Sequence, residues 1–150
     1  MSQPVENLDI RPITDPAELD MAARLIVSEI WHDTTQRPSA IQAAKEHFAR
    51  MDEYQMGAFD SDGQLVGVAG LANGSTLAEK NWALIVDVAT ASNKQRSGIG
   101  STVMRALHDH ARQQGIEETV IVSATKAGAS LYKSLGYKWD IYADAYRKKL

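Results

Sequence analysis

Apolar and polar residues alternate with two different periods along the first third of the chain. Residues 8–13 change from apolar to polar at nearly every second position, which is typical of a short strand. Apolar residues then recur at helical spacing up to about residue 31, and Asp15 with Glu18 forms the pattern of a capping box at the start of this helix. After a polar break, the same spacing returns over 41–51. This part of the chain predicts one strand and two helices.

The remaining two thirds alternate between strand-like and helix-like segments. Two strand-like runs flank Asp62 and Gly63, a turn signal that predicts a hairpin over 54–74. After it come an apolar strand at 82–90, a helix at 98–115, a buried strand at 119–125, a short helix at 129–136 and an ending with strand character at 137–150. This order of elements predicts an α/β fold with a mixed central sheet and about four flanking helices.

Length and composition fit one domain over residues 1–150 and exclude several kinds of chemistry. The 150 residues include no cysteine, so disulfides, thiolate zinc sites and thiol nucleophiles are excluded. The first residues, MSQPVENLD, lack a signal-peptide pattern, and no apolar run reaches the length of a membrane span. We therefore expect a cytoplasmic protein without a membrane partner. A net charge of −3 argues against bulk nucleic-acid binding, and we expect no nucleic-acid partner.

The stretch QRSGIGSTV, residues 95–103, joins the long apolar strand to the next helix. The first amides of a helix lack internal partners, and Gly98 and Gly100 let a ligand approach that backbone closely. A phosphate or pyrophosphate is the natural guest of such a site. A Walker loop would need a lysine in place of Ser101, and a dinucleotide fingerprint would need a third glycine in place of Val103. Spacing alone leaves a solvated helix start open beside the anion site.

Two motifs in the second half of the chain resemble those of one family. The sequence QRSGIG (95–100) follows the strand end VAT (88–90) and resembles the Gln/Arg-x-x-Gly-x-Gly/Ala motif of the GNAT superfamily of acyl-CoA-dependent N-acyltransferases. Downstream, LYKSLGY (131–137) is similar to that family's second motif, Leu-Tyr-x-x-Leu-Gly-Phe/Tyr. The resemblance covers essentially the whole chain. It implies a GNAT-like acyl-CoA N-acyltransferase fold with acetyl-CoA as co-substrate.

The resemblance also implies which residues hold the cofactor. Backbone groups of Val88, Ala89 and Thr90 would pair with the pantetheine arm. The amides that would hold the pyrophosphate are those of Gln95, Arg96, Ser97, Gly98, Ile99, Gly100 and Ser101. Ser130 and Tyr132 would lie near the thioester. The family's second motif usually offers an asparagine where Thr125 stands here, so an asparagine contact to the cofactor is not expected.

Acyl transfer to an amine needs a neutral nucleophile, a polarised thioester carbonyl and a stabilised leaving thiolate. A backbone amide near Val88 is the expected oxyanion donor. Tyr132 is the expected catalytic partner of the sulfur, because a tyrosine with a pKa of about 10 can protonate a thiolate whose pKa is about 8.5. A purely packing role is the alternative for Tyr132.

The general base stays open at the level of sequence. Many family members carry a carboxylate where Val86 or Leu84 stands here, and Asp87 is the only acid on the strand. An aspartate in a buried strand needs a partner. Asp87 is therefore either a catalytic residue or a structural one that pairs with a helix amide or a basic side chain.

For several other polar residues, an ordinary surface role is expected or stands as the alternative. Three candidate bases lie where this family's acceptor site usually opens, and each is otherwise a solvated surface group: Glu29, His32 and Asp33. His47 is expected to be a solvated helix residue, and the basic ending over 146–150 a solvated edge strand. His108 and His110 point to different faces of a helix, so we expect no metal.

These observations predict an N-acetyltransferase that moves an acetyl group from acetyl-CoA to a primary amine by direct transfer in a ternary complex. The acceptor is a small-molecule amine or a protein amino group, and a homodimer is expected from relatives of this size. The alternative is a non-catalytic acyl-CoA-binding sensor or regulatory module, which the apolar Val86 and Leu84 favour.

Overall fold

A seven-stranded mixed sheet forms the centre of the protein, with its strands in the order β1-β2-β3-β4-β5-β7-β6. The computed structural model describes residues 7–95, 97–122 and 126–150. The strands are β1 (Asp9–Pro12), β2 (Tyr54–Phe59), β3 (Leu65–Leu71), β4 (Trp82–Thr90), β5 (Glu118–Ile121), β6 (Lys138–Asp140) and β7 (Ala145–Lys149). Neighbouring strands are antiparallel except β4 and β5, which are parallel. The predicted α/β fold with a mixed central sheet is confirmed.

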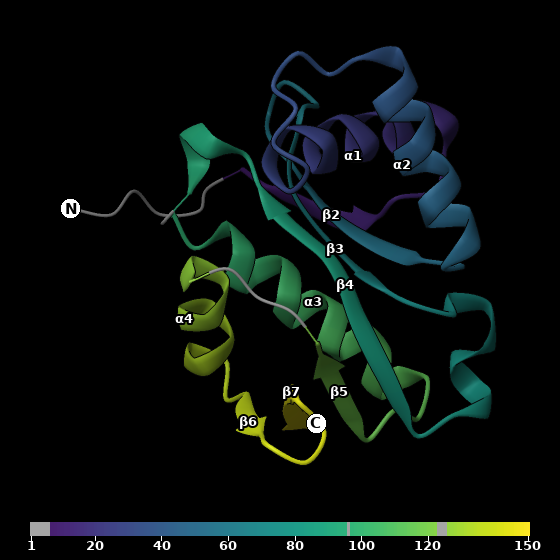
Figure 1. Cartoon of the computed structure of the whole chain (residues 1–150), viewed down its shortest axis with the longest axis vertical. Helices are drawn as coiled ribbons and strands as arrows, with labels where there is room; N and C mark the ends of the chain where they lie inside the picture. The colour runs from purple at the N-terminus through teal and green to yellow at the C-terminus, as the bar shows by residue number, and fades with distance from the viewer. Residues whose placement is uncertain (1–6, 96, 123–125) are drawn as a thin grey trace.

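Within the described residues, four α-helices cover the two faces of this sheet. They are α1 (Pro16–Glu29), α2 (Pro38–Arg50), α3 (Ile99–Gln113) and α4 (Lys126–Ser134). Figure 1 shows α1 and α2 on one side of the sheet and α3 and α4 on the other. The short 3₁₀ helices η1 (Gly74–Glu79) and η2 (Ser92–Lys94) flank β4 along the chain.

Each face of the sheet has its own hydrophobic core. Val103, Met104 and Leu107 of α3 are buried in one cluster, whereas Ile26 of α1 and Phe48 of α2 are buried in the other. Burial of an aliphatic or aromatic side chain contributes about 1.5–3 kcal/mol. The two clusters therefore hold the middle strands of the sheet in a fixed position.

The start of α1 follows its sequence signal only in part. Oδ1 of Asp15 accepts a hydrogen bond of 2.8 Å from the amide of Glu18, which caps the helix as predicted. The carboxylate of Glu18 binds the guanidinium of Arg11 on β1 and does not complete the capping box. The cap thus also links α1 to the first strand.

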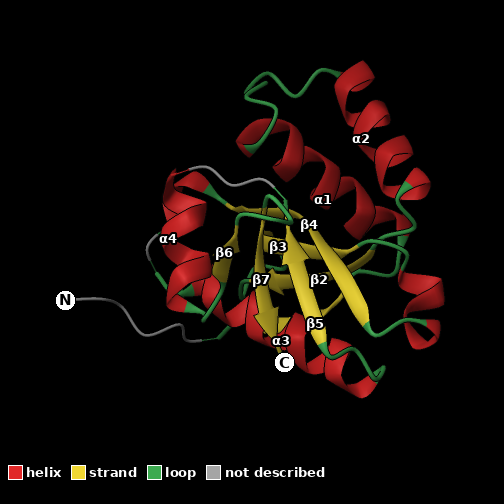
Figure 2. Cartoon of the chain, turned by 60° about the horizontal axis from the view of Figure 1, so that its bottom comes forward, coloured by secondary structure: helices red, strands yellow, loops and turns green. Residues whose placement is uncertain are grey.

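β4 and β5 stay together over only three residue pairs. These pairs are Trp82–Glu118, Ala83–Thr119 and Leu84–Val120. On its other side, β4 remains paired with β3 as far as Thr90; Figure 2 shows β4 beside these neighbours. Beyond Leu84, the edge of β4 that faces β5 has no ladder partner among the described residues. This free edge positions the site.

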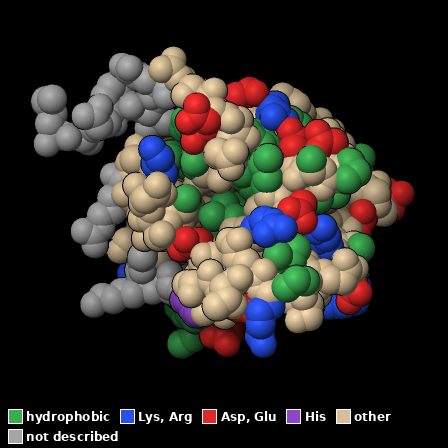
Figure 3. Space-filling view, turned by 90° about the horizontal axis from the view of Figure 1, so that it is seen from above, with side chains coloured by type: hydrophobic (Ala, Val, Ile, Leu, Met, Phe, Trp, Pro, Cys, Tyr) green, Lys and Arg blue, Asp and Glu red, His purple; other side chains and the backbone are tan. Residues whose placement is uncertain are grey.

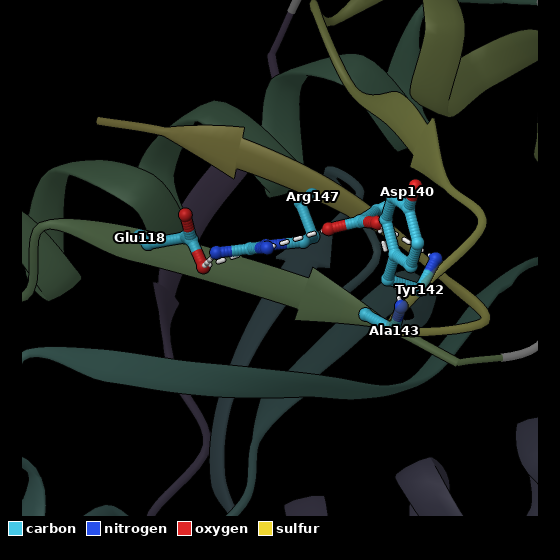
Figure 4. A network of polar contacts seen from close by, with 5 residues as sticks. All are labelled: Glu118, Asp140, Tyr142, Ala143 and Arg147. Atoms are coloured by element: carbon cyan, nitrogen blue, oxygen red, sulfur yellow. Dashed lines mark hydrogen bonds and ion pairs between the residues drawn. The ribbon is translucent and has the colours of Figure 1, made fainter.

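The end of the chain forms two short strands, where the sequence predicted one over 137–150. β7 lies between β5 and β6, so it is not an edge strand. The connection over 141–144 contains neither glycine nor proline, and its turn is formed with Asp140, whose Oδ1 accepts a hydrogen bond from the amide of Tyr142, and with Asp144 at a φ of 52°. Arg147 of β7 binds Glu118 of β5 at 2.6 Å and Asp140 of β6 at 2.6 Å, as Figure 4 shows. The basic ending is thus a paired strand whose arginine is held by two carboxylates.

The face of the molecule in Figure 3 carries charged side chains of both signs. Acidic and basic side chains are interspersed over this face of the molecule. Among the helices of the described ranges, none is long and apolar enough to cross a membrane.

Candidate functional site

A cleft of about 840 Å³ lies along the part of β4 that has left β5. Its walls are residues 85–90 of β4, residues 98–101 at the start of α3, and Tyr132 of α4. Titratable side chains from the α1 and α2 side also line it, namely Glu29, His32 and His47. The cleft thus combines a free strand edge, a helix N-terminus and several groups that can carry protons.

A β-bulge shapes the wall that β4 contributes. The register of β4 against β3 shifts by one residue, so that Asp87 and Val88 together oppose Ala69. Asp87 adopts a left-handed conformation with a φ of 52°. A bulge leaves one residue unpaired and changes the direction of nearby side chains. Both Asp87 and Val88 line the cleft.

Helix α3 begins at this cleft with the two glycines of the sequence motif. Gly98 directly precedes the helix with a φ of 86°, a conformation that costs most other residues about 1–2 kcal/mol. A Cβ on Gly100 would lie 3.2 Å from Cδ2 of Leu131 and 3.5 Å from Oγ1 of Thr90. Gly100 therefore allows close packing of α3 against α4 and β4. The amides of the first helical turn lack helical partners and suit an anionic group.

Most residues expected to hold a cofactor meet in this cleft. Its lining includes Val88, Ala89, Thr90, Gln95, Gly98, Ile99, Gly100, Ser101 and Tyr132. Ser97 and Ser130 are not part of the lining. The Ser97 hydroxyl donates to the carbonyl of Lys94, and Ser130 is exposed. Arg96 and Thr125 lie outside the described residues.

Tyr132 lies in the wall that α4 contributes. The residue is 6% exposed, and its ring is close to those of Tyr137 and Tyr146. Its hydroxyl forms no hydrogen bond with any other described residue. Burial raises the pKa of Tyr132 to about 12. The hydroxyl therefore keeps its proton at neutral pH and can donate a hydrogen bond into the cleft.

His47, Glu53 and Asp87 come together at the bulge of β4. Nε2 of His47 lies 2.9 Å from Oδ2 of Asp87 and 3.6 Å from Oε2 of Glu53. The His47 side chain is 30% exposed, against 11% for Asp87 and 0% for Glu53. The prediction of a solvated His47 is therefore wrong. The expectation that Asp87 needs a partner is confirmed, and the partner is a basic side chain.

Glu53 is the buried member of this cluster. Burial, reinforced by the hydrogen bond and the charge of Asp87, raises the pKa of Glu53 to about 9. Its Oε2 atom is buried and, as an acceptor, has no partner among the described residues. A proton on Glu53 avoids two buried negative charges side by side. The neutral carboxyl donates to Asp87 and leaves the negative charge there.

Sequence reasoning missed two members of the cluster for different reasons. His47 follows Ala44 by three positions and directly precedes Phe48, so it borders the buried stripe of α2. This position was the signal that could have revealed it. Glu53 is the last polar residue before β2, and nothing in the sequence separates it from an exposed connecting residue.

The other candidate bases differ in their surroundings. Oε1 of Glu29 accepts a hydrogen bond of 3.1 Å from the amide of Ser92. Hydrogen bonds from Thr35 and Arg37 hold the pKa of Asp33 below its ordinary value. Asp33 is not part of the cleft lining, whereas His32 is.

Three solved structures illustrate what this chain is similar to. An acetyltransferase of the GNAT family from Staphylococcus aureus Mu50 has a TM-score of 0.73 at 12% identity, covering 95% of this chain and 99% of that one. A GNAT family acetyltransferase from Brucella melitensis, in complex with acetyl-CoA, has a TM-score of 0.69 at 18% identity, covering 95% and 88%. A longer chain from Pyrococcus horikoshii has a TM-score of 0.71 at 19% identity, and the similarity spans 92% of this chain but 46% of that one. These similarities show a shared fold.

Comparison of the sequence with protein-family models identifies the family of this chain. A search of curated proteins finds no match. The model of the acetyltransferase (GNAT) family matches residues 21–137, a region that runs from α1 through the two glycines of α3 to Tyr137. The chain belongs to the GNAT family of acetyltransferases.

Proposed function

We propose that the protein transfers the acetyl group of acetyl-CoA to a primary amine by direct transfer in a ternary complex. The observation that carries this proposal is the meeting of a free strand edge and a glycine-started helix in one cleft. The amides of a pantetheine arm can pair with the open edge of residues 88–90, as a further strand would. A pyrophosphate suits the amides of residues 98–101. The Brucella relative, solved with acetyl-CoA, supports this choice of co-substrate.

The bonds that form and break in this reaction all belong to the two substrates. The amine nitrogen attacks the thioester carbon, a C–N bond forms, and the C–S bond breaks to give an amide and the CoA thiolate. The amide of Val88, at the bulge, is the proposed donor to the developing oxyanion. The sequence contains no cysteine, so a thiol acyl intermediate on the protein is excluded.

Tyr132 is the proposed partner of the leaving sulfur. Its pKa of about 12 lies well above that of a thiol, which is about 8.5. Complete proton transfer from this tyrosine to the thiolate would be uphill. The arrangement therefore favours a hydrogen bond donated to the sulfur, and solvent protonates the thiolate after release.

Three broader expectations remain predictions: a single domain over residues 1–150, a cytoplasmic location and a homodimer. The acceptor class, a small-molecule amine or a protein amino group, also remains open. Apolar Val86 and Leu84 favour the non-catalytic alternative, an acyl-CoA sensor. The protonatable cluster of His47, Glu53 and Asp87 beside the free strand edge favours the enzyme.

The test is thiol release from acetyl-CoA in the presence of a panel of primary amines: spermidine, glycinamide, glucosamine and a lysine-containing peptide. The proposal predicts that at least one amine stimulates release with saturation. If acetyl-CoA binds by calorimetry and no amine stimulates release, the result contradicts the enzyme and favours the acyl-CoA sensor. If ADP binds as tightly as CoA, the proposed cofactor site is wrong.

A further inference from the structure

An amine that attacks a thioester must lose an N–H proton to become an amide, and residues of β4 and α2 bring a suitable acceptor to the cleft. We propose that His47 is the general base, taking the amine proton on Nδ1, and that Asp87 is the positioning residue that holds the imidazole through Nε2. This inference rests on the proposed function and names its base.

The geometry gives the two ring nitrogens different roles. Nε2 of His47 is bound to Oδ2 of Asp87 at 2.9 Å. Within the described ranges, Nδ1 has no hydrogen-bond partner. The imidazole lines the cleft and is the most exposed member of its cluster. One nitrogen is thus fixed by the protein, and the other is available to a substrate.

The protons in the cluster determine the tautomer. Glu53 is fully buried and holds a proton that it donates to Asp87. With the proton on Glu53, the carboxylate oxygen of Asp87 is the acceptor in its 2.9 Å bond with Nε2 of His47. Nε2 must therefore carry the hydrogen in the bond to Asp87. In neutral His47 this leaves the lone pair on Nδ1, as a general base requires.

Asp87 itself is poorly placed to be the base. Its carboxylate is 11% exposed and accepts hydrogen bonds from both His47 and Glu53. Glu29 and His32 are the other titratable groups that line this side of the cleft.

The step balances in atoms and charge. The amine N–H proton moves to Nδ1 of His47 as the nitrogen forms its bond to the carbonyl carbon. The C–S bond then breaks, and its electron pair leaves with the CoA thiolate. His47 becomes a cation paired with Asp87 and returns its proton to solvent before the next turnover.

The first test is independent of turnover. Long-range ¹H–¹⁵N spectra of the ¹⁵N-labelled protein at alkaline pH identify the tautomer of His47, whose signals are assigned by their loss in His47→Gln. We expect a protonated Nε2 and an unprotonated Nδ1, and we expect this preference to weaken in Asp87→Asn. A hydrogen on Nδ1 in the wild-type protein would contradict the proposal.

The second test compares matched histidine variants, with the best amine of the panel as acceptor. His110 stacks on Tyr54 and is not part of the cleft lining, so His110→Gln is the control for His47→Gln. General bases contribute about 10²–10⁴-fold to rate. We expect His47→Gln to lower kcat about 100-fold or more with unchanged acetyl-CoA affinity, and His110→Gln to retain wild-type kcat.

Chemical rescue separates base catalysis from a structural effect. Free imidazole should restore part of the activity of His47→Ala and none to His110→Ala. Asp87→Asn should lower kcat and shift the pH profile, since it acts through His47. A His47→Gln variant that retains wild-type kcat overturns the base assignment alone. A wild-type protein that acetylates no amine overturns the proposed function together with it.

Discussion

Gly98 and Gly115 stand at the two ends of helix α3 in the same left-handed backbone conformation, with φ values of 86° and 84°. Only Gly98 lines the cleft. The two glycines therefore form a matched pair for substitution. A side chain would be strained at both positions, but only Gly98 lies where a ligand in the cleft could contact it.

Replacement of each glycine by alanine should separate these two effects. A side chain at positive φ costs about 1–2 kcal/mol, so both variants should lose a similar amount of stability in urea. Gly98→Ala should also weaken acetyl-CoA binding at least tenfold by calorimetry, because it disturbs the amides proposed to hold the pyrophosphate. Equal acetyl-CoA affinity in both variants would contradict the proposed cofactor site.

Tyr132→Phe should slow acetyl transfer without loss of acetyl-CoA affinity. A hydrogen bond to a charged group contributes about 1.5–3 kcal/mol, which corresponds to about 10–150-fold in kcat. Tyr146→Phe is the control, since Tyr146 packs near Tyr132 but is not part of the cleft lining. If both variants retain wild-type kcat, Tyr132 has only a packing role.

Glu53→Gln should stabilise the protein, and more so at alkaline pH. The pKa of Glu53 is raised from 4.5 to about 9, so the folded state holds a proton that the unfolded chain releases. Stability from this group is fully present below pH 4.5 and is lost as the pH rises through about 9. Glutamine stays neutral and still donates to Asp87. Because each pH unit between the two pKa values changes the unfolding free energy by about 1.4 kcal/mol, we expect the advantage of Glu53→Gln to grow by roughly 5 kcal/mol from pH 5 to pH 9.

Chemical unfolding of wild type and Glu53→Gln over this pH range checks the prediction. Glu53→Leu is the control, because it is also uncharged but cannot donate to Asp87. A constant difference between wild type and Glu53→Gln across the range would mean that Glu53 is ionised in the folded protein.

His108 should make the protein sensitive to mild acid. It is buried and bonded to the hydroxyl of Tyr137 at 2.7 Å. Burial, with help from nearby Lys148 and Arg112, lowers the pKa of His108 from 6.5 to about 4. The unfolded chain therefore binds a proton that the folded protein does not, and stability falls as the pH drops from 6.5 towards 4.

His108→Gln cannot titrate, so the difference between the two proteins isolates this effect. We expect wild type to lose about 2 kcal/mol more than the variant between pH 7 and pH 4.5 in denaturant unfolding. The His110→Gln variant, whose histidine is only partly buried, should follow wild type more closely. Parallel pH curves for wild type and His108→Gln would contradict a neutral buried His108.

Local periodicity was enough to predict the elements but not how they separate. Residues 82–90 read as a strand because they are nearly all apolar, and β4 covers the same span. That β4 leaves β5 after Leu84, and that a bulge forms at Asp87, are long-range features of the sheet. Neither feature can be predicted from the types of residue along the chain. The break at 141–144 was missed for a similar reason, since a turn without glycine or proline looks like continuous chain.

The glycine motif and the His47–Asp87 pair of the candidate site also differ in how far the sequence could predict them. Gly98 and Gly100 are close together in sequence, so the motif that contains them and its resemblance to the GNAT motif were enough to predict an anion site. His47 and Asp87 lie 40 positions apart and meet only because the fold brings the end of α2 next to the bulge of β4. The sequence showed that Asp87 needed a partner, whereas only the three-dimensional fold identifies that partner.

The central claim is tested most directly by following the acetyl group itself. Acetyl-CoA labelled with ¹³C in the acetyl group is incubated with the protein and each amine of the panel, and the products are analysed by mass spectrometry. We predict a labelled amide of at least one amine, formed in equal amount to free CoA and lost in a heat-denatured sample. Release of CoA with all of the label in acetate, and none in any amine, would contradict the account.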